Sequence, residues 1–157
     1  MQSPPPEEAH VESALAAAEC FLTERSLQLT PIRRAVLCLL YRAGKAVGAY
    51  DLIYQHEQIV RHRVAPNTIY RALAFLEKHR LVARLAGQRR YVAIAPRTDR
   101  FALFLTCTRC GATAELAAAS VESALGDAAG ALGFRAAQRP IEVEGLCERC
   151  RAAPETM

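Results

Sequence analysis

Four of the six cysteines in this chain fall into two closely spaced pairs. Cys107 and Cys110 stand in "CTRC", and Cys147 and Cys150 repeat the same spacing in "CERC". Two thiolates at this spacing can bind one tetrahedral ion, and two such pairs make the closed four-cysteine set of a structural zinc site. Closing the loop between the pairs costs far less than zinc binding contributes. The sequence therefore predicts one structural Zn²⁺ per protomer.

Two other kinds of cysteine chemistry remain open. A thioredoxin-type redox couple needs only one such pair beside a βαβ pattern, and disulfides form in oxidising compartments. The remaining cysteines, Cys20 and Cys38, stand among apolar neighbours in predicted helices, which favours small buried hydrophobic side chains without chemistry.

Length and composition limit what can surround the cysteines. The chain has 157 residues, of which 52% are hydrophobic, so it can form one ordinary domain or two small ones without disulfides. Its first ten residues, "MQSPPPEEAH", have neither the basic start nor the apolar run of a secretory signal. No run of 18 apolar residues is present, so we expect a cytoplasmic protein that does not span a membrane.

Charge is distributed unevenly along the chain. Residues 25–90 hold 13 Lys and Arg residues against three acidic ones, whereas residues 96–157 hold seven Arg against eight acidic residues. A basic first half joined to a near-neutral second half favours a polyanionic partner for the first half. A merely solvated basic surface is the simpler alternative.

Helix and strand patterns give the first half a recognisable order. Apolar spacing and end signals predict helices over 11–26, 31–43, 49–60 and 66–80, with Thr30 as the N-cap and Pro31 as the first residue of the second helix. Alternation then predicts a basic hairpin with strands 81–85 and 90–94. This order is that of a winged helix-turn-helix domain, whose later helix enters the DNA major groove.

The second half has a different pattern. Residues 96–100 form a linker or hinge, and strands are predicted over 101–106 and 112–116, on either side of the first cysteine pair. A helix follows from Ser120, as its N-cap, to Gly133, and then a strand broken at Pro140. The predicted fold class is therefore α+β. It comprises a disordered tail (1–10), a winged-helix domain (11–95), a hinge (96–100), a small α/β domain with the cysteines (101–151) and a second tail (152–157).

With these residues in view, the chain resembles the ferric uptake regulator family, and the zinc uptake regulator branch most closely. The similarity runs through "LTPIRRAVL", "AYDLI", "APNTIYRALAFLEKHRLV", "FLTCTRCGATAEL" and "GFRAAQRPIEVEGLCERC", in the family's order. The resemblance implies a homodimeric repressor of metal homeostasis genes that binds a palindromic double-stranded DNA operator. It also implies that the C-terminal domain dimerises and that its four cysteines hold a structural zinc.

Candidate DNA contacts follow from the matching motifs. In "NTIYRAL", Tyr70 and Arg71 match the recognition-helix pair and Thr68 precedes them, while Tyr50 of "AYDL" matches a tyrosine that contacts backbone and thymine. Independently of the family, Arg71 lies off the apolar stripe of its helix and has the forked geometry that reads guanine. Candidate phosphate contacts are Arg33, Arg34, Arg89 and Arg90.

The resemblance breaks down at a second zinc site, which senses metal in members of the zinc branch. The positions that match its three histidine or cysteine ligands read Ala83, Ile94 and Arg100, and only the glutamate, Glu115, is kept. No histidine follows His79. We therefore expect the sensing site to be lost, with Arg100 paired to Glu115 in place of the ion. Metal sensing through a rearranged site, for example at His56 and His62, and redox sensing at the cysteines are the alternatives.

Two other classes of function compete with this prediction. A zinc-ribbon interaction module or accessory regulator that no longer binds DNA specifically would also keep the four cysteines. The basic first half and the intact "TIYRAL" argue against it. An enzyme is not expected, because no nucleophile–base pair or phosphate-binding loop stands out and a closed four-cysteine zinc site has no open position.

Overall fold

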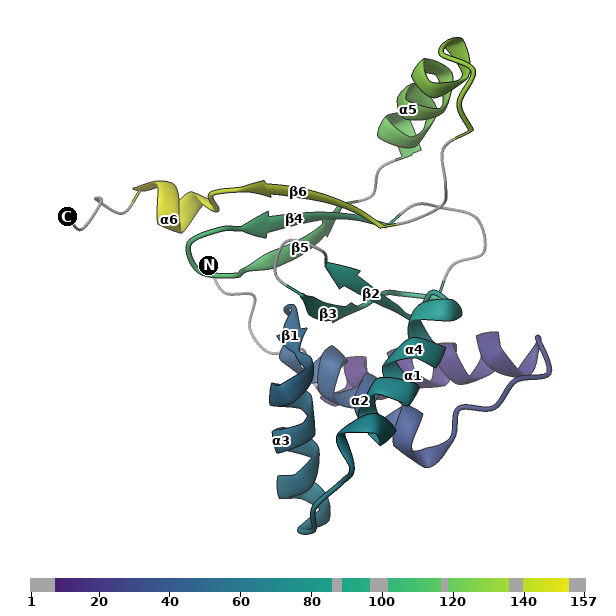
Figure 1. Ribbon diagram of the computed structural model, residues 1–157, viewed down its shortest axis with the longest axis vertical. Helices are drawn as coiled ribbons and strands as arrows, with labels where there is room; N and C mark the ends of the chain where they lie inside the picture. The colour runs from purple at the N-terminus through teal and green to yellow at the C-terminus, as the bar shows by residue number, and fades with distance from the viewer. Residues whose placement is uncertain (1–7, 86–88, 97–101, 117–118, 136–139, 153–157) are drawn as a thin grey trace. The chain divides into compact units, whose positions relative to one another are not determined.

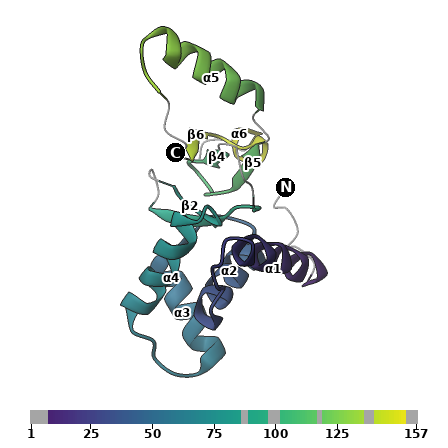
Figure 2. The same ribbon diagram turned by 90° about the vertical axis from the view of Figure 1, so that its right-hand side faces the viewer.

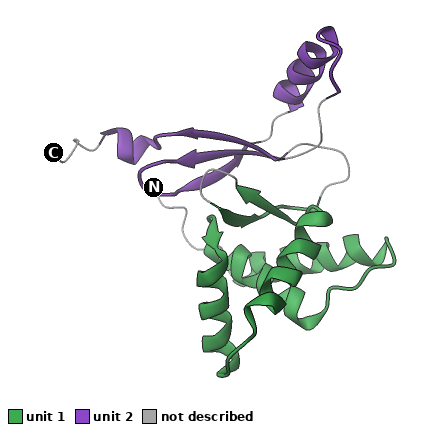
Figure 3. Cartoon of the chain, viewed as in Figure 1, with its two compact units in different colours: residues 1–96 green, residues 97–157 purple. Residues whose placement is uncertain are grey.

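The computed structural model describes residues 8–85, 89–96, 102–116, 119–135 and 140–152. The chain divides into two compact units, Met1–Pro96 and Arg97–Met157, called unit 1 and unit 2 below (Figure 3). Together they combine helices with two small sheets, which is the predicted α+β class. Within the described residues, no helix is both long enough and apolar enough to cross a membrane.

Unit 1 is built on four helices (Figures 1 and 2). The apolar faces of these helices share one core. They are α1 (Glu8–Thr23), α2 (Pro31–Ala43), α3 (Ala49–Val60) and α4 (Pro66–Lys78). Leu37 of α2 and Leu52 of α3 are completely buried in this core, as is Ile69 of α4. The periodicity that predicted the helices is therefore the periodicity of residues that pack inward.

Local end signals place the bounds of α2 and α4. Thr30 is the N-cap of α2 with extended backbone, although its side chain makes no capping hydrogen bond, and Pro31 occupies the first turn. Gly44 ends α2 in the left-handed region with φ 57°, where a residue without Cβ is favoured. Pro66 similarly begins α4.

Helix α1 differs from its prediction at both ends. It begins at Glu8, so residues 8–10 of the predicted tail are helical, and it ends at Thr23. The early start is accompanied by an ion pair between Glu8 and Arg42 of α2, with 3.0 Å between Oε1 and Nη2. Cys20, predicted to be buried, is exposed on this helix, because the buried stripe is formed by other residues. Cys38 is half-buried and packs against the core.

A small antiparallel sheet completes unit 1. Strands β2 (Val82–Leu85) and β3 (Arg90–Ala93) form the predicted hairpin, and the two-residue strand β1 (Val47–Gly48) pairs with β3 to give the order β1-β3-β2. Strand β1 was not predicted, because two residues carry no readable alternation. The arrangement of helices followed by a hairpin is that of a winged helix.

Unit 2 contains a mixed three-stranded sheet. Strand β4 (Leu103–Cys107) lies in the middle, antiparallel to β5 (Thr113–Leu116) and parallel to β6 (Ile141–Gly145). Helix α5 (Ala119–Ala131) connects β5 to β6 in the sequence, and the short helix α6 (Glu148–Ala152) follows β6. Ser120 is not the N-cap of α5, since the helix already begins at Ala119. Helix α6 was not predicted; its five residues are too few to show a period.

Register gives this sheet one apolar and one mixed face. Leu105 of β4 pairs with Ala114 of β5 and with Val143 of β6, so these three side chains form a row on one face. On the opposite face Phe104 lies between Glu115 and Glu142. Phe104 is buried, whereas Leu105 and Val143 on the apolar face are each more than two-fifths exposed.

Candidate metal centre and nucleic-acid interface

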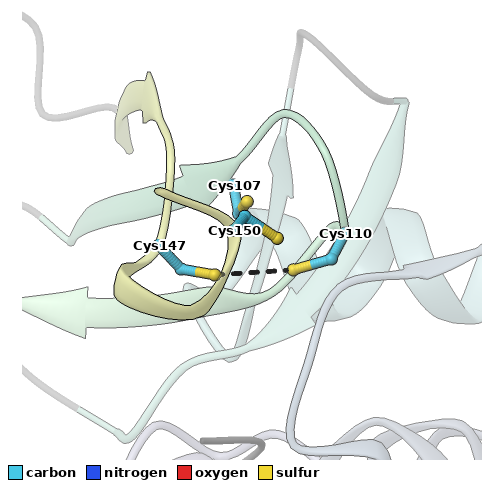
Figure 4. Close-up of side chains that lie close together, drawn as sticks. All are labelled: Cys107, Cys110, Cys147 and Cys150. Carbon is cyan, nitrogen blue, oxygen red and sulfur yellow. Dashed lines mark hydrogen bonds between the residues drawn. The ribbon is translucent and has the colours of Figure 1, made fainter. Parts of the chain in front are cut away.

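The four paired cysteines meet at one end of the sheet of unit 2 (Figure 4). Cys107 ends β4, Cys110 follows in the turn, and Cys147 and Cys150 lie just before and inside α6. Their sulfur atoms all lie within 4.8 Å of one another. Among the described residues they are the only cluster of three or more His, Cys, Asp or Glu side chains placed to share an ion.

The sulfur spacing fits a metal better than a disulfide. Cys110 Sγ and Cys147 Sγ are 3.7 Å apart. The edge of a tetrahedron with Zn–S bonds of about 2.3 Å is about 3.8 Å, whereas a disulfide brings its sulfurs to about 2.05 Å. All six cysteines are free thiols in this structure. The donor set and its spacing therefore suit Zn²⁺.

Backbone amides around the first cysteine pair favour the thiolate form of its sulfur atoms. The Gly111 amide donates to the carbonyl of Cys107 at 2.9 Å, and Gly111 itself has φ 71°, in the left-handed region. The pKa of the Cys107 thiol is lowered to about 6, first by the backbone N–H of Cys147 and then by that of Cys110. The Ala112 amide is the main cause that lowers the pKa of Cys110. Amides aimed at sulfur stabilise the thiolate form, which is the form that binds metal.

The buried partner on the second turn behaves differently. Burial is the largest cause that raises the pKa of the Cys150 thiol, and its hydrogen bonds to the other cysteines add to this. Without a cation, four adjacent sulfurs, two of them on buried cysteines, resist taking up four negative charges. A divalent ion at the centre would supply the missing positive charge.

Two arginines that the sequence analysis did not select lie next to the cysteines. Arg109 donates from Nη1 to the carbonyl oxygen of Cys150. The pKa of the Arg149 guanidinium is raised, first by a side-chain hydrogen bond to Cys110 and then by the negative charge of that sulfur. The sequence did contain a signal that could have pointed to these two arginines. Each cysteine motif carries an arginine directly before its second cysteine.

The candidate DNA-reading surface is the outer face of the first half of α4. Thr68, Tyr70 and Arg71 are exposed there, while Ile69 and Ala72 of the same helix are buried. No acidic residue occupies the first turn of α4. Buried residues on one face thus leave a polar, cationic helix end open to a partner.

The remaining candidate contacts lie in different settings. Tyr50 at the start of α3 is 78% exposed. Arg89 is exposed beside the hairpin turn with φ 49°, and Arg90 is half-buried in β3. Two of the predicted phosphate contacts already have partners within unit 1. Arg33 lies over the ring of Phe75 at 3.4 Å from its centroid, and Arg34 pairs with Glu12 at 2.8 Å.

Comparison with known proteins identifies the family. The model of the ferric uptake regulator family matches residues 24–144, which is most of the chain. The chain belongs to the ferric uptake regulator family. Members of this family are transcription regulators and not enzymes.

Several of the proteins to which this chain is similar are zinc uptake regulators. The chain is 34% identical over 147 residues to the zinc uptake regulation protein of Escherichia coli strain K12, covering 92% of this chain and 85% of that protein. It is similar to a zinc uptake regulator solved in complex with zinc and DNA, with 32% identity, a TM-score of 0.80 and coverage of 90% of this chain and 95% of that one. The crystal structure of holo XcZur gives 41% identity, a TM-score of 0.77 and coverage of 90% and 99%.

Two of the positions that the resemblance matches to the sensing site of the zinc branch carry side chains that cannot bind a metal. Ala83 is completely buried in β2 and Ile94 is 5% exposed, so two of the four positions carry apolar side chains. Glu115 lies on β5 in register with Phe104. Arg100 lies outside the described residues, so its predicted pair with Glu115 stays a prediction. His56 and His62 are not part of any potential metal cluster among the described residues.

Proposed function

We propose that this member of the family is a repressor of zinc homeostasis genes that binds a palindromic DNA operator as a homodimer. In this proposal unit 1 reads DNA and unit 2 forms the dimer around one structural zinc per protomer. The observation that carries it is a cationic, exposed α4 face on a winged-helix unit, within a chain that also holds the four clustered cysteines. The similarity to a regulator solved with zinc and DNA supports the same assignment.

Base reading is assigned to α4 and α3. Arg71 makes a forked contact to a guanine edge, worth about 1–3 kcal/mol of discrimination. Tyr70 and Thr68 contact the neighbouring bases and backbone, and Tyr50 contacts the adjacent strand. Arg89 and Arg90 contact phosphate from the wing. Arg33 and Arg34 join them by exchanging their present partners for phosphate, which costs little for an exposed ion pair such as Arg34–Glu12.

Dimerisation is assigned to the apolar side of unit 2. Helix α5 has no buried residue in the single chain, and Leu132 and Phe134 beside its end are more than 70% exposed. The row of Leu105, Ala114 and Val143 adds an apolar sheet face. Apolar area of this kind is typical of a surface covered by a second copy. We expect Leu105→Asp to convert the dimer into a monomer in sedimentation experiments while zinc content stays unchanged.

In this proposal, the protein does not sense metal at the position used by the zinc branch. Zinc needs three or four N, S or O donors, and Ala83 and Ile94 supply none. The repressor then binds DNA without a second regulatory ion.

The decisive experiment measures metal stoichiometry and DNA binding together. Purified protein is analysed by native mass spectrometry, and operator affinity is measured at each zinc loading. We expect one tightly bound zinc per protomer and no further gain in DNA affinity once that ion is present. Two tight ions per protomer, or affinity that rises with added zinc beyond the first, would contradict the loss of sensing.

A second experiment tests DNA reading. Arg71→Ala is compared with Lys78→Ala, which removes an exposed charge from the other end of the same helix. We expect Arg71→Ala to weaken operator binding by about 10-fold or more and random DNA only slightly, whereas Lys78→Ala weakens both alike. Equal losses on operator and random DNA would reject Arg71 as the base reader. A flat response of affinity to salt would favour an interaction module that does not bind DNA.

A further inference from the structure

The arginines of unit 1 differ in whether they already have a partner. Four arginines between residues 25 and 42 contact an acidic side chain or an aromatic ring: Arg25, Arg33, Arg34 and Arg42. Arg61 and Arg63, in the turn between α3 and α4, are both exposed. Among the residues that the structure describes, neither of their side chains forms an ion pair or a ring contact. Their two charges are therefore open to an anionic partner.

The turn that carries these two arginines is fastened to α3 by Glu57. Arg61 ends α3 with φ 55°, and its amide donates to the carbonyl oxygen of Glu57 at 2.8 Å. The side chain of Glu57 accepts a hydrogen bond from the amide of Val64, with 2.9 Å between Oε1 and N. Val64 also packs against the core of unit 1. The backbone on both sides of Arg63 is thus held in place.

The turn and the hairpin lie at opposite ends of α4. Residues 61–65 directly precede α4, whereas β2 and β3 follow it in the chain. Figures 1 and 2 show α4 running from this turn to the sheet of unit 1. Helix α4 has 13 residues and spans about 20 Å, which exceeds the major groove's width of about 12 Å. Because a helix in that groove has a phosphate backbone on either side, each end of α4 is placed to meet one.

We propose that Arg61 and Arg63 bind phosphates on the side of the major groove opposite to the hairpin. The inference rests on the DNA-binding function proposed above and adds a second backbone contact to it. Neither arginine has to leave a partner, whereas Arg34 would have to leave Glu12. Glu57 acts as a positioning residue, since it holds the turn and does not itself contact DNA. Contacts to phosphate carry no base information, so they strengthen binding to every sequence.

The test is the salt dependence of binding to a random-sequence DNA duplex, measured by fluorescence anisotropy with the full-length protein. The double variant Arg61→Ala/Arg63→Ala is compared with Arg25→Ala/Arg42→Ala, which removes the same charge from arginines that already have acidic partners. For the first variant we expect weaker binding and a slope of log K against log salt that is shallower by about 0.9 for each lost contact. The control should keep the wild-type slope.

Two variants of Glu57 test its positioning role. Glu57→Gln and Glu57→Ala remove the same charge, but only glutamine keeps a side-chain oxygen that can accept from the Val64 amide. We expect Glu57→Ala to bind the duplex more weakly than Glu57→Gln, and equal affinities would reject the role of Glu57.

The slopes also separate this inference from the function on which it rests. A steep wild-type slope that Arg61→Ala/Arg63→Ala leaves unchanged, or that the control lowers equally, would overturn the contact of the turn while DNA binding stands. A flat slope in the wild-type protein would overturn both.

Discussion

The two units differ in how much of their apolar surface they bury within one chain. Among the described residues, 23 hydrophobic side chains are buried in unit 1 and five in unit 2, two of which are cysteines. Unit 1 joins most of its buried residues in one continuous cluster across all four helices. Unit 2 instead leaves aliphatic side chains such as Leu105 and Leu132 exposed.

This contrast shows two ways to stabilise a small domain. Unit 1 has enough core to fold by hydrophobic burial, and most of its large exposed apolar residues are tyrosines, whose hydroxyl groups suit a wet interface. The described part of unit 2 buries few apolar side chains for its size, and small domains of this kind are usually stabilised by a metal, a partner or both. In the function proposed above, the four cysteines provide the metal site and the apolar face provides the partner surface.

Zinc removal gives the largest expected difference between the units. Cys107→Ser should abolish zinc retention and unfold unit 2, because structural zinc contributes about 10–16 kcal/mol of apparent binding free energy. Hydrogen exchange should lose protection over residues 102–152. Unfolding followed by tyrosine fluorescence should hardly change, since all five tyrosines lie in unit 1: Tyr41, Tyr50, Tyr54, Tyr70 and Tyr91.

The control for this experiment is Cys20→Ser, which alters an exposed thiol of α1 and should leave both units unchanged. If the tyrosine transition of Cys107→Ser moved together with the loss of zinc, the two units would be one cooperative structure and the contrast between them would fail.

A core truncation in unit 1 should have the next largest effect. Leu37 is completely buried in α2, so Leu37→Ala should lower the free energy of unfolding by about 2–5 kcal/mol through lost burial and a residual cavity. The tyrosine signal in urea is the measurement. Leu105→Ala in unit 2 is the matched control, and it should leave this transition unchanged. A zinc content that fell in Leu37→Ala would show that unit 2 depends on the core of unit 1.

We expect acid to lower the stability of unit 1 by a smaller amount than the core truncation does. His56 is 6% exposed on α3 and its Nδ1 has no hydrogen-bond partner in the structure. Burial first, and the charge of His62 second, lower its pKa below 6.5, although Glu57 opposes this. Since the unfolded chain takes up the proton more readily, the stability of unit 1 falls as pH drops below 6.5 towards the folded pKa.

The measurement is the urea midpoint of the tyrosine signal at pH 7 and pH 5. His56→Leu should lose less stability than wild type over this interval, because it has no buried imidazole to protonate. His10→Gln, at an exposed position of α1, serves as the control. A loss in His56→Leu as large as in wild type would assign the acid sensitivity of unit 1 to other groups.

Local sequence signals were sufficient for most of the elements and for the metal cluster. Pro31, Gly44 and Pro66 mark helix ends through their own backbone preferences, so the bounds of α2 and α4 were readable without any partner. The cysteine spacing likewise encodes one half of a tetrahedral site in each motif. Elements without a local period, such as β1 and α6, escaped prediction.

Only the tertiary structure decided which side chains are already engaged and which remain open. The sequence by itself predicted four arginines as equivalent phosphate contacts: Arg33, Arg34, Arg89 and Arg90. In the folded unit 1, however, Arg33 stacks on Phe75 and Arg34 pairs with Glu12. The sequence also marked the four cysteines, yet could not show Arg109 donating to the carbonyl oxygen of Cys150. Helix and turn preferences act over a few residues and can be read from the chain, whereas these contacts join positions 22 to 42 residues apart and exist only after folding brings them together.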